Sequence, residues 1–193
     1  MKRYKSEEFE IDFKNPLGKG GFGEVYKATE KETNKVYAIK RISINKLNEE
    51  EIGNMLIMNK CDNSIKYGFF EKDNLMYLIM ELCDCNLEQL IKRKKLNIKE
   101  IKDILNQLNN VFKMMWDNKI IHRDIKPENI LIKKLENNQY LYKLTDYGLS
   151  TQLNNSNKPS TFAGTIDYIA QEIRNNLNIE IKSWFMDHWN SYS

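Results

Sequence analysis

The feature that most constrains the fold is an amphipathic segment near the middle of the chain. Large apolar residues recur with the 3.6-residue period of an α-helix over about five turns. They are Ile98, Ile101, Ile104, Leu105, Leu108, Val111, Phe112, Met115 and Trp116. The sequence therefore predicts a helix over residues 98–116, with an apolar stripe on one face.

The residues before this helix have a different pattern. Short apolar runs with β-strand character alternate with polar turns. They cover residues 25–28, 36–40, 65–70 and 75–82. Asn48, followed by three Glu residues, predicts a helix start, because Asn accepts free N–H groups and carboxylates favour the positive end of the helix dipole. We therefore expect a small sheet with one helix, and a boundary between two lobes near residues 83–86.

Composition excludes several classes of protein. The 30 Lys and Arg residues nearly balance the 27 Asp and Glu residues, which argues against a nucleic-acid binder held by a basic face. Three Cys residues cannot form a disulfide scaffold and favour a reducing compartment. No apolar run approaches the roughly 18 residues that span a bilayer. We expect a cytoplasmic protein, with the nucleus left open, and no nucleic-acid or membrane partner.

The strongest chemical signal is the polar segment His-Arg-Asp-Ile-Lys-Pro-Glu-Asn at residues 122–129. It places Asp124, Lys126 and Asn129 at fixed offsets directly after the long helix. A second carboxylate, Asp146, follows in Thr-Asp-Tyr-Gly. Two carboxylates and an amide oxygen are ligands that Mg²⁺ accepts together with phosphate oxygens. This pattern indicates metal-assisted phosphoryl transfer.

A glycine-rich segment precedes these motifs. Gly18, Gly20 and Gly23 form G-x-G-x-x-G, a spacing that dinucleotide-binding folds also use between a strand and a helix. Here residues 24–26 continue as a strand, which favours a hairpin flap whose backbone N–H groups approach phosphates. Lys40 ends the next predicted strand, and a strand holds an ammonium group rigidly enough to bind a diphosphate.

Together these motifs resemble those of eukaryotic protein kinases, from about Phe9 to Glu172. Lys126, two residues after Asp124, resembles the serine/threonine branch more than the tyrosine branch. The resemblance implies an α+β, two-lobed fold: a small N-terminal β-sheet lobe with one helix, and a mainly α-helical, incomplete C-terminal lobe. It also implies ATP and Mg²⁺ as cofactors, and a protein substrate with a serine or threonine acceptor; the oligomeric state stays open.

The resemblance also divides the chain. It implies a tail at residues 1–8, an N-lobe at 9–83, a hinge at 81–86 and a partial C-lobe at 87–193. The nucleotide-binding residues it implies are Leu17, Gly18, Gly20, Gly21, Phe22, Gly23, Val25, Ala38, Lys40, Glu81, Cys83 and Leu131. In this assignment Val25, Ala38 and Leu131 sandwich the adenine, and the hinge backbone binds its edge. Met80 takes the gatekeeper position.

The catalytic residues that the resemblance implies are Lys40, Glu51, Asp124 and Lys126, with Asn129 and Asp146 as ligands of two Mg²⁺ ions. Asp124 accepts the proton of the substrate hydroxyl, and Lys126 contacts the transferring phosphate. Lys40 holds the α- and β-phosphates.

Two further assignments follow the family pattern. A Glu in the N-lobe helix should pair with Lys40, and we assign Glu51, with Glu50 as the alternative. Thr161 lies where many kinases are phosphorylated, with Arg123 as one partner for that phosphate.

The sequence departs from the family in three places. Tyr147 replaces the usual Phe of D-F-G, so its hydroxyl needs a partner or water. Gln171 replaces the Pro of A-P-E. Few residues follow Glu172, where a kinase continues through several helices, including a partner for residues 98–116. A frameshift just after Ser183 is our preferred explanation.

Two alternatives to an active kinase remain open. One is a truncated or frameshifted fragment that binds nucleotide or a partner without turnover. The other is a nucleic-acid module built on the basic run at residues 92–95, which we interpret instead as a solvated loop because the run is short and lacks aromatic residues.

Overall fold

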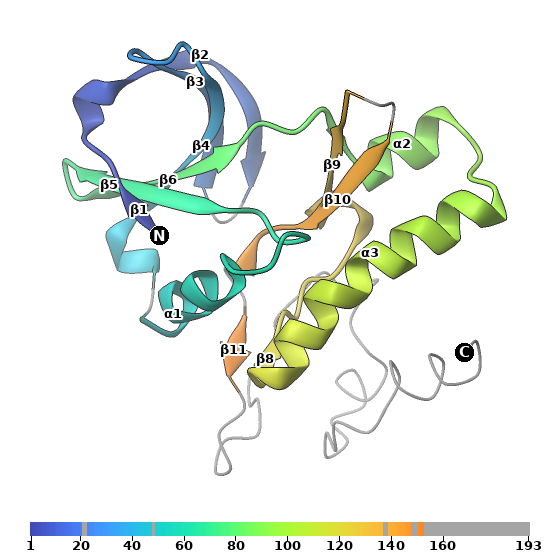
Figure 1. Cartoon of the computed structure of the whole chain (residues 1–193). Helices are drawn as coiled ribbons and strands as arrows, with labels where there is room; N and C mark the ends of the chain where they lie inside the picture. The colour runs from blue at the N-terminus through green and yellow to red at the C-terminus, as the bar shows by residue number, and fades with distance from the viewer. Residues whose placement is uncertain (21–22, 48, 137–138, 148–149, 153–193) are drawn as a thin grey trace.

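The computed structural model of the chain describes residues 1–20, 23–47, 49–136, 139–147 and 150–152. These residues form a β-sheet lobe, on the left of Figure 1, and a second lobe that carries the longest helix. The chain passes between the lobes after strand β6. The two-lobed α+β architecture expected from the sequence is therefore confirmed.

The first lobe is built on a six-stranded sheet in the order β1-β5-β6-β4-β3-β2. Its strands are β1 (Lys2–Arg3), β2 (Phe9–Gly20), β3 (Gly23–Glu30), β4 (Val36–Ser43), β5 (Tyr67–Lys72) and β6 (Leu75–Glu81). All pairs are antiparallel except β1 with β5. The first eight residues, expected as a tail, thus contribute an edge strand and a short 3-10 helix, η1 (Ser6–Glu8).

Helix α1 (Glu49–Met58) packs below this sheet and follows a second 3-10 helix, η2 (Ile44–Lys46) (Figure 1). Its N-terminal glutamates agree with the predicted start, while the predicted cap Asn48 lies outside the described residues. The Lys66 Nζ donates to the carbonyls of Asn59 and Cys61 at 2.8 and 2.7 Å, which satisfies acceptors that follow the helix.

Strand β5 begins later than the apolar run at residues 65–70 predicts. The Ile65 N–H donates instead to the Leu144 carbonyl at 2.9 Å, and Ser64 forms an isolated parallel bridge with Leu144. Because this backbone is used between the lobes, it is not available to the sheet, and β5 starts at Tyr67.

The second lobe combines two helices with short strands. The elements are β7 (Cys85–Asn86), α2 (Leu87–Arg93), α3 (Ile98–Asp117), β8 (Ile120–Ile121), η3 (Pro127–Asn129), β9 (Ile130–Lys134), β10 (Tyr140–Leu144) and β11 (Thr151–Gln152). Helix α2 was not predicted, although Asn86 and Gln89 form a capping box at its start. Helix α3 has the predicted bounds within one residue, and Asn97 caps it.

The apolar stripe of α3 is divided between two environments. Ile104, Leu108, Val111 and Met115 are buried in the core. Ile98 and Trp116 remain 74% and 58% exposed. Within the described part of the chain, every helix is too short or too polar to span a bilayer.

Candidate active site

Lys40 lies in the middle of the sheet, where β4 is paired on both sides. It stands opposite Val25 of β3 and Leu78 of β6, so its backbone is fixed by two ladders. Its Nζ contacts the Asp146 Oδ1 at 2.7 Å, and only 12% of the lysine side chain is exposed. This ion pair joins two residues that the sequence assigned separately and that belong to different lobes.

The backbone of Asp146 adopts a φ of 65°, in the left-handed region that non-glycine residues rarely occupy. Three hydrogen bonds hold this turn. The Asp146 N–H donates to the Tyr67 hydroxyl at 3.1 Å. The neighbouring Thr145 donates its N–H to the Asn129 carbonyl at 2.9 Å, and its own carbonyl accepts from His122 Nε2 at 2.9 Å. The Asp146 turn is therefore attached to the segment that carries Asp124 and Asn129.

Asp124 is buried and surrounded by hydrogen-bond donors. Its Oδ2 accepts from Asn129 Nδ2 at 2.8 Å and contacts Lys126 Nζ at 3.0 Å. Asn129 Nδ2 also donates to the Asp124 carbonyl at 2.8 Å. Two donors on one oxygen orient the carboxylate. The structure thus brings Asp124, Lys126 and Asn129 together, as the spacing predicts.

His122 links this segment to Asp146 and was not assigned a role from the sequence. It is 1% exposed, and burial lowers the pKa of its imidazole. Because the Thr145 carbonyl can only accept, Nε2 carries the proton, and the Asp124 N–H donates to Nδ1 at 3.3 Å. A neutral imidazole with both nitrogens used therefore supports the backbone on either side of the site.

The glycine hairpin is formed by the end of β2 and the start of β3, where Gly20 pairs with Gly23. Gly23 has a φ of 130°, and a Cβ there would overlap the Arg41 carbonyl oxygen, so the fold requires glycine. At Gly18 a Cβ would meet no atom of the described residues within 4 Å, so none of these residues requires a glycine there. Open space beside this backbone fits a bound phosphate; Gly21 and Phe22 lie outside the described residues.

The residues expected around the adenine come from three strands. Val25 is half-buried, Ala38 is buried and stands opposite Met80, and Leu131 of β9 is half-buried beside the linker. Leu17 is 53% exposed. Their contact with adenine stays a prediction.

The linker after β6 is braced from the second lobe. Glu81 contacts Lys133 at 2.8 Å and Lys143 at 2.6 Å. Burial alone would raise the pKa of Glu81, but these two ammonium groups outweigh it and lower the pKa. The backbone N–H and C=O of Cys83 make no hydrogen bond to another described residue, whereas the Asp84 N–H donates to the Ile132 carbonyl at 2.9 Å. Cys83 therefore offers the polar backbone that an adenine edge would bind.

Glu51 is buried on the inner face of α1. Glu51 also acts electrostatically on Arg123, the residue before Asp124: burial lowers the pKa of Arg123, and the charges of Glu50 and Glu51 oppose this. The pairing of Glu51 with Lys40 stays a prediction. Thr161, the predicted phosphorylation site, lies outside the described residues.

Tyr147 fills the position where its family resemblance expects Phe. Its ring is fully buried and lies 5.0 Å from the His122 ring. Its hydroxyl lies 2.9 Å from the Ser64 hydroxyl, so the buried phenol has the partner that it needs. Burial raises the pKa of Tyr147, which keeps this hydroxyl protonated.

The donor atoms fit a magnesium site by their chemistry. Asp146 supplies a carboxylate, and Asn129 directs its amide nitrogen at Asp124, which turns its amide oxygen away from that carboxylate. Oxygen ligands from one or two side chains, completed by phosphates and water, are typical of Mg²⁺. Among the described residues no group of three His, Cys, Asp or Glu gathers as a metal cluster.

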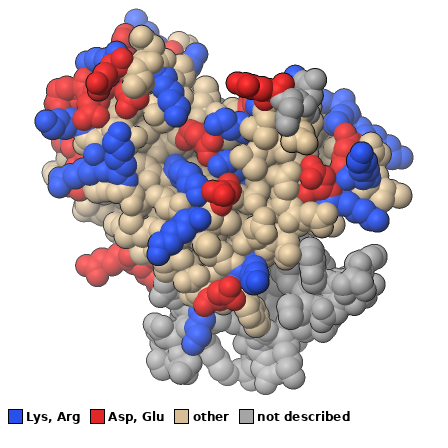
Figure 2. Space-filling view, in the orientation of Figure 1, with Lys and Arg blue, Asp and Glu red and all other residues tan. Residues whose placement is uncertain are grey.

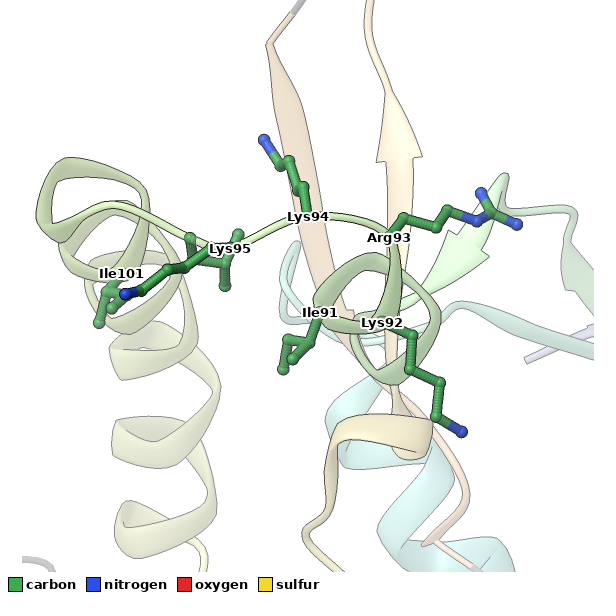
Figure 3. A pocket seen from close by; sticks show the side chains of 7 residues that line it. Ile91, Lys92, Arg93, Lys94, Lys95 and Ile101 are labelled. Carbon is green, nitrogen blue, oxygen red and sulfur yellow. The ribbon is translucent and has the colours of Figure 1, made fainter.

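The basic run at residues 92–95 covers the end of α2 and the start of the turn that leads to α3. It lines a pocket of about 550 Å³ between α2 and α3, together with Ile91, Leu96 and Ile101 (Figure 3). Lys92 pairs with Glu88 and Lys94 pairs with Glu100, each at 2.5 Å. Figure 2 shows acidic and basic side chains mixed over the visible described surface. The absence of a nucleic-acid partner stays a prediction.

A sheet lobe, a linker and a helical lobe, with Lys40 and Asp146 joined across them, define the protein-kinase-like class. The sequence pattern of the protein kinase domain matches residues 11–189, beyond the end of the resemblance at Glu172. This chain therefore belongs to the protein kinase family.

Its relatives include serine/threonine kinases. The chain is 34% identical over 199 residues to "Probable serine/threonine-protein kinase PLK" of Dictyostelium discoideum, which covers 98% of this chain and 19% of that protein. It is 38% identical over 178 residues to "Serine/threonine-protein kinase pakG" of the same organism, and this match covers 87% of this chain and 15% of that protein. For "Serine/threonine-protein kinase cst-1" of Caenorhabditis briggsae the identity is 32% over 186 residues, and this match covers 93% of this chain and 37% of that protein. The chain thus spans less than half the length of these relatives.

Proposed function

We propose that this chain transfers the γ-phosphoryl group of ATP to a serine or threonine hydroxyl of a protein, with Mg²⁺ at the phosphates. The observation that carries the proposal is the ion pair at 2.7 Å between Lys40 and Asp146. It joins the glycine-hairpin lobe to the lobe that holds Asp124, Lys126 and Asn129. The serine/threonine specificity is supported by three similar proteins, each of which is named a serine/threonine kinase.

Each side chain would contribute through position and charge. The ammonium group of Lys40 binds the α- and β-phosphates next to Asp146. The carboxylate of Asp124, oriented by Asn129, accepts the proton of the substrate hydroxyl. Lys126, 3.0 Å from that carboxylate, stabilises charge on the transferring group.

Asn129 and Asp146 would hold Mg²⁺ through their side-chain oxygens. When bound, Mg²⁺ neutralises the negative charge that the phosphate oxygens carry during transfer. The backbone of Cys83, which makes no hydrogen bond to another described residue, would bind the edge of the adenine. A cytoplasmic location is part of the proposal, based on the thiol content of the chain.

The test compares phosphate transfer and nucleotide binding in the same preparations. We expect Asp124→Asn to lower transfer from Mg-ATP to a mixed serine/threonine peptide library at least 100-fold while ADP still binds. Asp103→Asn, an exposed change on α3, serves as the matched control and should keep wild-type transfer. Equal transfer by Asp124→Asn and the wild type would refute the proposal.

The alternative is a protein that binds nucleotide without turnover. Mg-ADP that raises the unfolding temperature of the wild type, with no phosphate transfer to any peptide, would support this alternative.

A further inference from the structure

The hydroxyl group of Tyr67 connects the sheet lobe directly to the backbone of Asp146. It accepts a hydrogen bond from the Asp146 N–H at 3.1 Å and lies 3.1 Å from the Thr145 hydroxyl. Tyr67 is 4% exposed, so the protein itself must supply the hydrogen-bond partners of its hydroxyl. A Phe at this position would retain the ring and lose both contacts.

Asp146 needs such support because its backbone is in an unfavourable conformation. A φ of 65° is rare for a residue with a Cβ, and such a residue keeps it only where its surroundings fix it. The direction of the carboxylate depends on this backbone. Lys40 contacts the carboxylate itself, whereas Tyr67 binds the N–H of the same residue. The two contacts therefore restrain different parts of Asp146.

Tyr67 is itself held firmly. The Asn59 side chain, just after α1, donates to the Tyr67 carbonyl at 2.8 Å and accepts from the Tyr67 N–H at 2.7 Å. The Tyr67 ring also meets the buried Tyr147 ring edge-on, with centroids 6.4 Å apart. These contacts fix the phenol oxygen of Tyr67 in place, and they connect the residue after α1 to the backbone of Asp146.

We propose that Tyr67 is a positioning residue, whose hydroxyl holds Asp146 in the backbone conformation that presents its carboxylate to Mg²⁺ and the nucleotide phosphates. This inference rests on the proposed function, because it assigns Asp146 to the metal. Tyr67 acts through Asp146 and has no contact of its own with the reacting atoms.

The test removes one oxygen atom with Tyr67→Phe in the full chain. The matched control is Ser64→Ala, which removes another buried hydroxyl nearby, one bound to Tyr147 and not to Asp146. The first measurement is amide hydrogen exchange of Asp146 by NMR without nucleotide. We expect exchange to be at least fivefold faster in Tyr67→Phe and unchanged in Ser64→Ala.

The second measurement is ADP binding by calorimetry over a range of MgCl₂ concentrations. We expect Tyr67→Phe to need at least threefold more Mg²⁺ for half of the full effect, with the same ADP affinity in EDTA. Unchanged exchange and unchanged Mg²⁺ dependence in this variant would overturn the inference and leave the proposed function standing. A wild type that binds no ADP at any Mg²⁺ concentration would overturn both.

Discussion

The glycines of the hairpin motif provide a sharp test, because the structure separates two roles that the sequence pattern treats alike. At Gly23 the φ of 130° is unfavourable for any L-residue, and an added Cβ would overlap the Arg41 carbonyl oxygen and lie 3.2 Å from its carbon. These atoms belong to the paired backbone of β4, so they cannot rotate away. At Gly18 an added Cβ meets no atom within 4 Å among the residues that the structure describes.

The two alanine variants should therefore affect different properties: Gly23→Ala should lower stability, and Gly18→Ala should weaken nucleotide binding. Backbone strain of about 1–3 kcal/mol, with the overlap added, predicts that Gly23→Ala loses about 2 kcal/mol or more of unfolding free energy. For a chain of this size that corresponds to a Tm lower by about 4–8 °C. Gly18→Ala should keep or slightly raise the Tm, because alanine restricts the unfolded chain. It should nevertheless bind ADP about tenfold more weakly, since its methyl group occupies space proposed for phosphate.

The assay is thermal unfolding of both variants and the wild type, each with and without Mg-ADP. A third variant, Gly53→Ala in α1, is the control for replacing a glycine with open space around it at a site remote from the hairpin, and it should be stabilised by about 0.5–1 kcal/mol. The reasoning is refuted if Gly18→Ala and Gly23→Ala lose equal stability, or if Gly18→Ala binds ADP as the wild type does.

Two further predictions concern buried titratable groups. Burial lowers the pKa of His122 in the folded chain. Below pH 6.5, the ordinary histidine pKa, the unfolded chain therefore binds a proton at His122 that the folded chain does not bind. The free energy of unfolding should fall by at most about 1.4 kcal/mol per pH unit as the pH drops from about 6.5 toward the lower pKa of the folded state. Urea unfolding between pH 8 and 5.5 measures this slope. A His122→Gln variant should show a smaller slope. Burial, with Glu81 nearby, raises the pKa of Cys83 to about 12, so iodoacetamide at pH 8 should label this thiol at least 100-fold more slowly than free cysteine. Rapid labelling of Cys83 in peptide mass spectra of the folded protein would contradict this.

Much of the local structure follows from the sequence because its causes are local. The 3.6-residue period predicts α3 almost to its ends, and the alternating runs predict the central strands. Where a neighbouring chain segment competes for the backbone, the prediction fails: Ile65 is apolar and strand-like, yet its N–H bonds to Leu144. Helix α2 has a capping box, but its short apolar pattern gives a weak periodic signal.

The candidate site was likewise predictable from local sequence only in part. The offsets between Asp124, Lys126 and Asn129 are short, so one loop suffices to bring these side chains together. Lys40 and Asp146 lie far apart in the chain, so no local spacing relates them. From the sequence, only the resemblance to a family assigned both residues to one site, and the structure shows their contact. No motif indicated Tyr67, because alternation marks it only as a buried strand residue.

The sequence by itself thus determined the kinds of element, the chemical groups and their order, because periodicity, capping and loop spacing act over a few residues. Only the tertiary structure decided which of those groups meet. The 2.7 Å contact between Lys40 and Asp146, the hydroxyl of Tyr67 on the Asp146 backbone and the Ser64 partner of Tyr147 each join segments far apart in sequence. Such contacts depend on how two lobes pack, and burial then makes each unpaired polar atom costly enough to require a partner.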